Sequence, residues 1–488
     1  MLQSNVVRAK AAPLSNTNFA RNTLLAAMLA AGLCSQQAQA ADDKALEQIR
    51  NELKEMRAAY EARMAAMEQK LNQAQAQNAQ LQQQLQDKSA SAAPAASAAA
   101  APTAKAKKAA GNMNEFNPAL ALNLSATMAN QSQHPEEYKI QGVLPSGGEV
   151  GPAKRGFSLG ESEITLFANV DPNFSGQLTF ALGEEGHAEV EEAFIDTRSL
   201  GNGLKIRAGR MFSGVGYANS QHAHAWDFID APLAYRALFG GQYKREGVQL
   251  KWLAPTERYL EFGLELGNGG SFPGTPRDKN GFADSAVFVK LGDDFGPNAS
   301  WRIGAAWMRD KTANLEFTDS DDTGAEVAQT YSGRSRTLVL DGVWKWAANG
   351  QSVKISGEYL RRWYDGQLSW SNDPATVVMS DYSSRHNGWY VQGVYKFAPQ
   401  WQVGLRHEQL TGSQNNGLLT AGGLTAQQMP LLSDFKPRKT TLALDYLPSE
   451  FSRLRLQYGH EQASSGRTDK QIYLQYNMSL GAHQAHAY

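Results

Sequence analysis

Four residues within one short segment have side chains that could bind a metal ion. His222, His224, Asp227 and Asp230 lie within nine positions of one another. Imidazole nitrogens and carboxylate oxygens are common zinc ligands, and two histidines two positions apart share a face where the chain is extended. The alternative is that these side chains pack or hydrogen-bond the segment against its surroundings. The motif has no third ligand of known position, so we predict packing, with no metal and no cofactor, and keep metal binding as an alternative.

This segment belongs to a long loop between two expected strands. On each side of the loop, apolar residues alternate with charged or polar ones, which predicts strands with one apolar and one polar face. The apolar positions are Leu204, Ile206 and Ala208 before the loop and Val248, Leu250 and Trp252 after it. About 38 residues, 209–246, separate the two strands, a length associated with functional loops. If the polar faces line a barrel, this loop is well placed to fold inward and narrow it.

Short turns and strands alternate through the rest of the chain. Clusters of Pro, Gly, Asn and Asp mark seven hairpin turns, at 171–173, 200–203, 254–256, 293–297, 347–350, 398–400 and 448–450. Fourteen strands flank these turns, and a first strand at 120–128 and a last one from 472 bring the count to about sixteen. Bacterial outer-membrane barrels have even strand numbers in this range.

The links at the other ends of the strands are longer, and aromatic residues flank the short turns. The long links are expected at 129–157, 209–246, 267–283, 310–336, 361–387 and 411–438. Short turns at one end, long loops at the other and aromatic girdles are typical of outer-membrane proteins. The aromatic residues near the turns include Phe174, Trp252, Tyr259, Phe295, Trp346, Phe397, Trp401, Tyr446 and Phe451. A soluble sandwich would also alternate, but it would not gather aromatics beside the turns.

The chain before the barrel divides into three segments. Residues 1–40 have the pattern of a secretory signal peptide, with basic residues, an apolar core at 24–33 and a small-residue cleavage site at Ala38-Gln39-Ala40. The single cysteine, Cys34, would be lipidated in a lipoprotein, but Leu33 before it is too large for that signal. Removal of this segment leaves no cysteine, which excludes disulfides and thiolate metal sites in the mature chain.

Residues 41–88 follow a helical period. Apolar residues recur in steps of three and four from Leu46 to Leu85, over about five heptads, which predicts a parallel coiled coil in the periplasm. A single solvated helix is the alternative, although a helix this polar would be marginal alone. Residues 89–112, rich in Ala, Pro and Lys, predict a flexible linker, and the barrel is expected at 113–488.

The composition fits a barrel that spans a membrane with strands. Mean hydropathy is -0.46 and no run of about 18 apolar residues follows the signal segment, whereas a barrel needs apolar residues only at alternate positions. A formal net charge of -1 gives no argument for a nucleic-acid partner. The expected inward faces carry more bases than acids, which predicts at most a weak anion preference, although cross-strand ion pairs are an equal explanation. The residues expected to line or constrict the pore are Lys205, Arg207, Arg210, His222, His224, Asp227, Asp230, Arg236, Lys251, Arg453 and Arg455.

Two stretches resemble the phosphate- and polyphosphate-selective porin family, the porin O and P type. They are the run from Ile206 to Gly216 and the run from Phe228 to Leu233. The resemblance implies a sixteen-stranded trimeric porin whose third loop folds inward, over residues 113–488. Phe212, Gly214 and Ala231 stand where the family has Lys, Pro and commonly Arg, so this chain has fewer basic groups there.

We therefore predict an all-β transmembrane protein, an antiparallel outer-membrane β-barrel of about sixteen strands preceded by an α-helical coiled coil. It would act as a homotrimeric porin for passive diffusion of small hydrophilic solutes, with a weak preference for phosphate-like anions. Its other partner would be outer-membrane lipid, and we expect no enzymatic activity. The terminal Tyr488 resembles the signal read by the barrel-assembly machinery. Two alternatives stay open, a channel or receptor for a metal ion or complex that uses the loop histidines, and a structural tether whose coiled coil binds another envelope component.

Overall fold

The computed structural model describes residues 119–146, 150–183, 188–276, 278–321, 323–373 and 376–481. The chain divides into two compact units, 1–108 and 109–488, and every described residue belongs to the second. The expected signal peptide at 1–40, coiled coil at 41–88, linker at 89–112 and terminal Tyr488 lie outside the described residues. Among the residues described, no helix is both long and apolar enough to cross a membrane.

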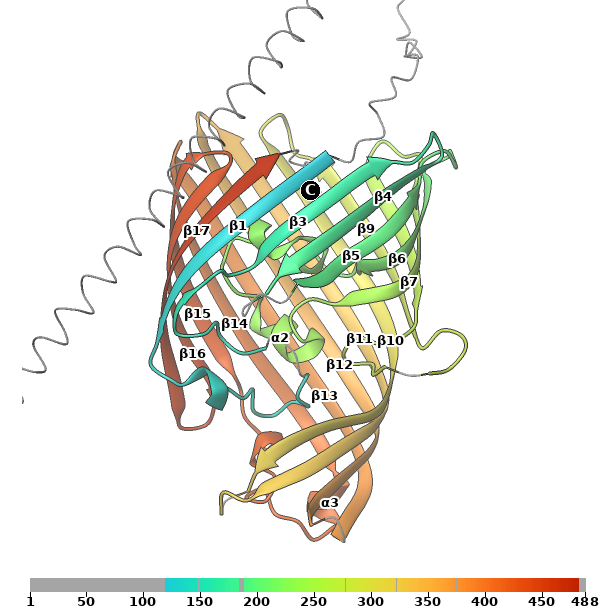
Figure 1. The fold of residues 1–488 in the computed structure, drawn as a ribbon, viewed down its shortest axis with the longest axis vertical. Helices are drawn as coiled ribbons and strands as arrows, with labels where there is room; N and C mark the ends of the chain where they lie inside the picture. The colour runs from blue at the N-terminus through green and yellow to red at the C-terminus, as the bar shows by residue number, and fades with distance from the viewer. Residues whose placement is uncertain are drawn as a thin grey trace, which may run out of the picture. The chain divides into compact units, whose positions relative to one another are not determined.

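The second unit is a closed antiparallel β-barrel (Figure 1). The barrel closes where β1 pairs with β17, from Ala121 opposite Gly481 to Gln131 opposite Gln471. The short strand β2 and the strand β3 pair with different parts of β1 and together take one strand position in the barrel wall. The seventeen strands therefore form a barrel with sixteen strand positions. The predicted antiparallel barrel of about sixteen strands is confirmed, whereas the coiled coil of the predicted fold class lies outside the described residues. The strands are β1 (Ala119–Gln131), β2 (Gly156–Ser158), β3 (Ser162–Asn169), β4 (Phe174–Leu182), β5 (Ala188–Thr197), β6 (Leu204–Phe212), β7 (Lys244–Leu253), β8 (Tyr259–Gly267), β9 (Asp284–Asp294), β10 (Ala299–Ser320), β11 (Glu326–Ala348), β12 (Gln351–Asp373), β13 (Thr376–Ala398), β14 (Trp401–Asn416), β15 (Arg438–Ser449), β16 (Ser452–Ser464) and β17 (Arg467–Gly481).

All seven predicted short turns join consecutive strands at one end of the barrel. The turn between β11 and β12 shows the chemistry that makes this predictable. Asn349 and Gly350 have φ angles of 53° and 77°, the left-handed conformation that a two-residue hairpin turn requires. The register then continues without a shift from Ala348 opposite Gln351 along both strands.

Side chains alternate between the two faces of the barrel wall as the period predicts. Large apolar side chains are exposed on the outside, for example Val248, Leu250, Trp252, Phe262, Leu264, Leu454, Leu456, Ile472 and Leu474. The intervening positions are polar and buried, among them Gln249, Glu265, Lys290, Arg302, Glu358, Arg455 and Gln457. Exposed aromatic residues lie beside the short turns, and Trp252 stacks on Phe262 with the ring centroids 5.6 Å apart. The wall is therefore apolar outside and polar inside.

Two of the expected long loops are strands instead. Residues 310–336 and 361–387 were predicted as loops, but β10 to β13 run for 22 or 23 residues each and only the hairpin tips are irregular. A strand needs about 9–11 residues to cross a bilayer, so these hairpins project beyond the rest of the barrel (Figure 1).

The projecting hairpins have an apolar inner face. Tyr331, Tyr364, Leu368 and Tyr382 pack there on residues of the link 417–437, which carries α3 (Gly417–Thr420). This second core gives the hairpins packing partners beyond the membrane-crossing part of the wall, which is why the strand period continues through both stretches.

Candidate pore and its inward loop

The loop between β6 and β7 occupies residues 213–243 and lies inside the barrel. The strands run slightly further than predicted, because β6 ends at Phe212 and β7 begins at Lys244. Backbone N–H groups along the loop donate to inward side chains of the wall. Gly214 donates to Glu265 on β8 (2.8 Å), Ala218 to Glu358 on β12 (2.8 Å), Leu233 to Glu408 on β14 and Ile229 to Gln457 on β16 (2.9 Å). The loop therefore crosses the lumen from β6 to the opposite wall.

The centre of this inward loop is the helix α2 (Leu233–Phe239). Its sequence, Leu-Ala-Tyr-Arg-Ala-Leu-Phe, is apolar on nearly every side, and all seven residues are buried. A helix that is apolar all round needs an apolar environment. Pro232 precedes the helix, and Gly240, with a φ of 71°, ends it in the left-handed conformation that favours glycine.

The helix α2 packs against an apolar patch on the inner wall. The inward residues of this patch are Ala286, Phe288, Ala306, Met308, Val339, Leu360, Tyr390 and Leu410, on β9 to β14. Charges on the wall match the helix dipole, because the carboxylate of Glu408 accepts from the first N–H and the guanidinium of Arg362 donates to the carbonyl of Leu238. Both the packing and the charges hold the helix in the lumen.

A substitution at Gly388 on β13 tests whether stability depends on the close packing of α2 against the wall. A Cβ at Gly388 would lie 2.7 Å from the Cβ of Ala234 and 2.8 Å from Leu410, so a larger side chain must displace the helix. We expect Gly388→Leu to lower the free energy of unfolding by about 1–3 kcal/mol through overpacking. The measurement is thermal unfolding in detergent. Gly393→Leu on the same strand is the matched control, because a Cβ there meets nothing within 4 Å; equal shifts for both variants would contradict the close packing.

Buried charges fasten the loop to β14, β15 and β16. Asp230 lies 2.9 Å from Lys439 and 3.1 Å from Arg406, and Lys439 lies 3.1 Å from Glu461. Glu461 also pairs with Arg236 of α2 at 2.7 Å. Burial would raise the pKa of Asp230, but Lys439, Arg406 and Arg236 together hold it well below its usual range. The loop carboxylate is therefore charged at neutral pH and paired with wall cations.

The lowered pKa of Asp230 predicts how acid affects the loop. A carboxylate with a depressed folded-state pKa contributes stability above its unfolded pKa of about 3.9, and this stability is lost as the pH falls towards the folded value. We expect Asp230→Asn to cost about 1–3 kcal/mol at pH 7 by leaving buried cations without their partner. The difference from wild type should persist down to about pH 4 and shrink below it. Unfolding midpoints between pH 3 and 8 provide the check; a difference that vanished between pH 5 and 7 would contradict the assignment.

Two arginines of β16 hold the middle of the loop. Arg453 donates to the carbonyls of Trp226 (3.1 Å) and His224 (3.0 Å), and Arg455 donates to that of Trp226 (3.2 Å) while it pairs with Asp445 through two contacts of 2.7 Å. These guanidinium groups were predicted as pore lining, and the structure places them against the loop backbone.

A cavity of about 720 Å³ lies between the loop and the wall on the side of the short turns. It is lined by residues of β3 to β10 near that end, such as Tyr259 and Asp293, and by His222 and His224 of the loop. Arg207, Lys251, Lys290 and Arg302 also line it. Both histidines and several wall charges therefore share one polar space.

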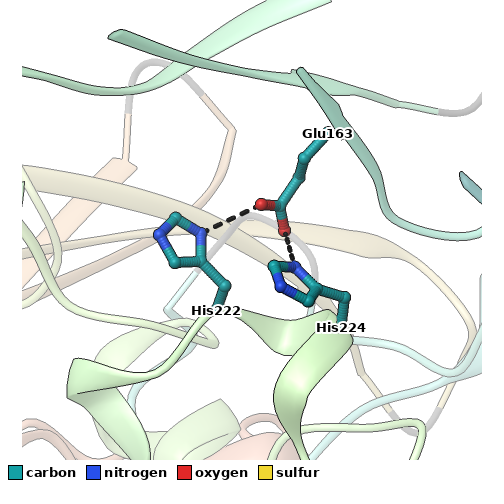
Figure 2. Close-up of side chains that lie close together, drawn as sticks. All are labelled: Glu163, His222 and His224. Carbon is teal, nitrogen blue, oxygen red and sulfur yellow. Dashed lines mark hydrogen bonds and ion pairs between the residues drawn. The ribbon is translucent and has the colours of Figure 1, made fainter. Parts of the chain in front are cut away.

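The two histidines have glutamate partners: Glu163 of β3 contacts both (Figure 2), and two glutamates of β5 contact His222. His222 Nδ1 lies 3.1 Å from Glu163 and 3.2 Å from Glu191, its Nε2 lies 3.1 Å from Glu192, and His224 Nδ1 lies 3.0 Å from Glu163. Burial would lower the pKa of His222, but its hydrogen bonds to the three glutamates raise it well above the usual value. Asp227 and Asp230, the partners considered from sequence, point elsewhere: Asp227 pairs with Lys354 at 2.7 Å.

The basic residues on β6, β7 and β9 differ in how far acids neutralise them. Lys205 and Arg207 both pair with Asp196 at 2.7 Å. Lys251 and Lys290 share Glu261, each at 3.9 Å. Lys251 and Lys290 are thus two positive charges with one acid between them at the cavity wall.

Two residues predicted to line the pore lie elsewhere. Arg210 pairs in register with Glu246, which shares the outward phase of Val248 and Leu250, and its guanidinium lies 3.1 Å from both Glu246 and Glu189. It therefore lies on the outer face, in the same phase as Ile206 and Ala208 and opposite to Arg207, and the register of β6 is continuous there. Arg236 is buried on α2, 2% exposed, and faces Glu461 rather than an open lumen.

A second segment also enters the lumen. In the link between β1 and β2, Ile140 and Val143 belong to the same apolar core as α2. The hydroxyl of Ser146 donates to the carbonyl of Arg236 (3.0 Å), and Arg236 donates to the hydroxyl of Tyr138 (2.9 Å). The inward loop is thus covered on one side by another part of the chain.

Comparison with known proteins gives the chain a family. No protein-family model matches it. An uncharacterized protein of Aquifex aeolicus (strain VF5) is 30% identical over 356 residues, which are 69% of this chain and 71% of that protein. The chain belongs to the family of this Aquifex protein. This match covers most of both chains.

Solved structures with a similar fold include three outer-membrane proteins. The trimer form of OmpT from Vibrio cholerae has a TM-score of 0.46 and 12% identity, over 74% of this chain and 99% of that one. The outer membrane channel DcaP of Acinetobacter baumannii has a TM-score of 0.46 and 12% identity, over 76% and 99%. The anion-selective porin from Comamonas acidovorans has a TM-score of 0.45 and 13% identity, over 75% and 100%.

Several residues that hold the loop were not identified from the sequence. They are Glu191, Glu192, Lys439 and Glu461. Glu191 and Glu192 are adjacent yet both buried, because a bulge in β5 opposite Thr179 and Phe180 interrupts the alternation. Two consecutive acids inside a period-two strand are the signal that could have indicated them.

Proposed function

We propose that this protein is an outer-membrane porin through which small hydrophilic solutes diffuse passively, with the inward loop 213–243 as its constriction. The observation that carries the proposal is a loop crossing a closed barrel whose wall is apolar outside and charged inside. An apolar outer face of this extent suits lipid, and a polar lumen suits water and solutes. The loop would set the size and charge of what passes.

A weak preference for anions, phosphate-like ones among them, is the finer part of the proposal. Lys251 and Lys290 share a single acid, Glu261, at the cavity wall. An anion that enters the cavity would meet this excess of positive charge, which lowers its energy relative to that of a cation. The acids Asp293 and Asp294 at the short-turn rim act in the opposite direction, so the preference stays weak.

Charge removal at these lysines tests the selectivity. Purified protein in a planar bilayer should give discrete conductance steps, and the reversal potential in a salt gradient should indicate a modest excess of anion permeability. We expect Lys251→Gln with Lys290→Gln to move the reversal potential to neutral or cation-selective, because Glu261 then loses both partners. Lys279→Gln, an exposed position in the link between β8 and β9, is the control. Steps without a shift in the double variant would refute the role of this pair, and no steps from folded protein would refute the open channel and favour a structural tether.

The assembly we propose is a homotrimer with outer-membrane lipid around it. The support comes from the heptads at 41–88, which predict a parallel homo-oligomer, and from the porin resemblance at 206–216 and 228–233. Native mass spectrometry in detergent is expected to give three chains per particle, and conductance steps should arrive in threes. A variant without residues 41–88 separates the contribution of the helix to assembly from that of the barrel. If the barrel stays trimeric, it does not need the helix for assembly.

A further inference from the structure

We propose that Glu163, His222 and His224 bind a divalent transition-metal ion of the Zn²⁺ class, which attaches the inward loop to the barrel wall. The site goes beyond the proposed transport function, and its binding can be measured without any current. The ligands come from different parts of the chain, Glu163 from β3 and the histidines from the loop (Figure 2).

The spacing of the ligand atoms suits a zinc ion. Bonds of about 2.0–2.1 Å in tetrahedral geometry put neighbouring ligand atoms about 3.3 Å apart. His222 Nδ1 lies 3.1 Å from Glu163 Oε2 and His224 Nδ1 lies 3.0 Å from Glu163 Oε1. All three residues offer ligand atoms within 4.8 Å of one another. Two imidazoles and one carboxylate are the protein ligands of one common class of zinc site.

The electrostatics of the cluster favour a cation. Glu163, Glu191 and Glu192 all lie within 3.2 Å of His222, and Lys244 pairs with Glu191 at 3.2 Å. Three carboxylates thus surround one imidazole. Glu163 is fully buried, and its two carboxylate oxygens face the two histidines, Oε2 towards His222 and Oε1 towards His224. A metal ion would supply positive charge to this group of carboxylates.

A partner for the other ring nitrogen of His222 is already in place. Glu192 Oε2 lies 3.1 Å from Nε2 and can accept its proton, which leaves Nδ1 with its lone pair towards Glu163. Metal-binding histidines usually have such a carboxylate on the far nitrogen, where it orients the ring and increases its basicity. The rings of His222 and His224 lie stacked, 5.6 Å apart, so both are positioned on the same side of Glu163.

The donor set and its surroundings also predict selectivity and access. Imidazole donors suit zinc, copper and nickel, whereas Ca²⁺ and Mg²⁺ prefer oxygen ligands alone. All three ligands line the cavity of about 720 Å³, so a fourth coordination position faces this space and can take water or a small anion. An ion there would join the loop to β3.

Zinc binding by the purified full-length protein tests the proposal. Titration of Zn²⁺ against a chromophoric chelator should show one tight site per chain, and Mg²⁺ at the same concentrations should not compete. X-ray absorption at the zinc edge should show two histidine nitrogens and oxygen neighbours at about 2.0–2.1 Å. Glu163→Gln and His222→Gln with His224→Gln should each weaken binding at least tenfold. His460→Gln is the matched control, an exposed histidine on β16 outside the cluster.

Each of these measurements distinguishes a metal site from a network of ion pairs that binds no metal. The glutamine variants keep hydrogen-bonding groups, and the heat-dependent electrophoretic shift of a barrel reports whether they fold. Wild type without a stoichiometric site, or equal zinc affinity in wild type and the double histidine variant, would overturn the proposal. Stoichiometric zinc binding by folded wild-type protein that gives no conductance steps would support the site and refute the transport function independently.

Discussion

Replacing residues 214–242 by an Asn-Gly turn is expected to increase single-channel conductance several-fold. The backbone N–H of Ser213 donates to the carbonyl of Tyr243 (3.1 Å), so β6 and β7 end as partners and a two-residue turn can join them. The change removes α2 and every loop residue that crosses the lumen. A sixteen-stranded barrel without an inward loop leaves an aqueous channel, and current through it is limited by the narrowest cross-section.

The deletion needs a control for shortening and for folding. Removing residues 423–427 shortens the link between β14 and β15, which packs on the projecting hairpins, and should leave conductance unchanged. The folded state of both variants is checked by electrophoresis with and without heating. Unchanged conductance in a folded loop deletion would assign the constriction to the link 132–155 instead of the inward loop.

The second large effect is expected at Glu461. This carboxylate is 1% exposed and contacts Arg236 at 2.7 Å, Lys439 at 3.1 Å and the hydroxyl of Tyr138 at 2.6 Å. Removing one partner of a buried ion pair typically costs about 3–5 kcal/mol, because the other charge stays buried without compensation. We expect Glu461→Leu to lower the free energy of unfolding by this amount. Thermal or denaturant unfolding in detergent measures it.

A second substitution separates the lost contact from the remaining charge. Arg236→Met in addition to Glu461→Leu removes the uncompensated guanidinium and should recover part of the loss, because apolar replacement of a whole buried pair is often neutral. Glu450→Gln, an exposed glutamate in the short turn between β15 and β16, should stay within about 0.5 kcal/mol of wild type. Additive effects of the two core substitutions would show that Arg236 and Glu461 do not act as a pair.

The fold could be predicted from the sequence because its information is local. The alternation of Lys205, Ile206 and Arg207, and of Val248, Gln249 and Leu250, gives the two faces of a strand without knowledge of any neighbour. The turn residues Asn349 and Gly350 fix a hairpin within four positions of the chain. Seven such turns fix the strand number and the antiparallel order. Closure of β1 on β17 then follows, since an open edge would leave backbone groups unpaired.

Prediction from the sequence failed where one local pattern is compatible with two structures. Residues 310–336 contain polar and small residues that suit a loop as well as a hydrated strand, and the apolar link 417–437 that covers the projecting hairpins is remote in sequence. The assignment of Arg210 to the lumen failed for another reason: it lies three positions after Arg207, and a period of two puts it on the opposite face, with Ile206 and Ala208.

The partners of the inward loop were decided by the tertiary structure alone. His224 meets Glu163 from 61 positions earlier, and Asp230 meets Lys439 from 209 positions later. Such pairs depend on barrel closure, on the stagger of the strands and on the path of the loop across the lumen, which no short-range pattern encodes. The sequence by itself determined a barrel with a long loop that carries histidines and acids. Only the closed wall, which brings distant strands to within 3 Å of that loop, determined which charges compensate one another and where a metal ion can bind.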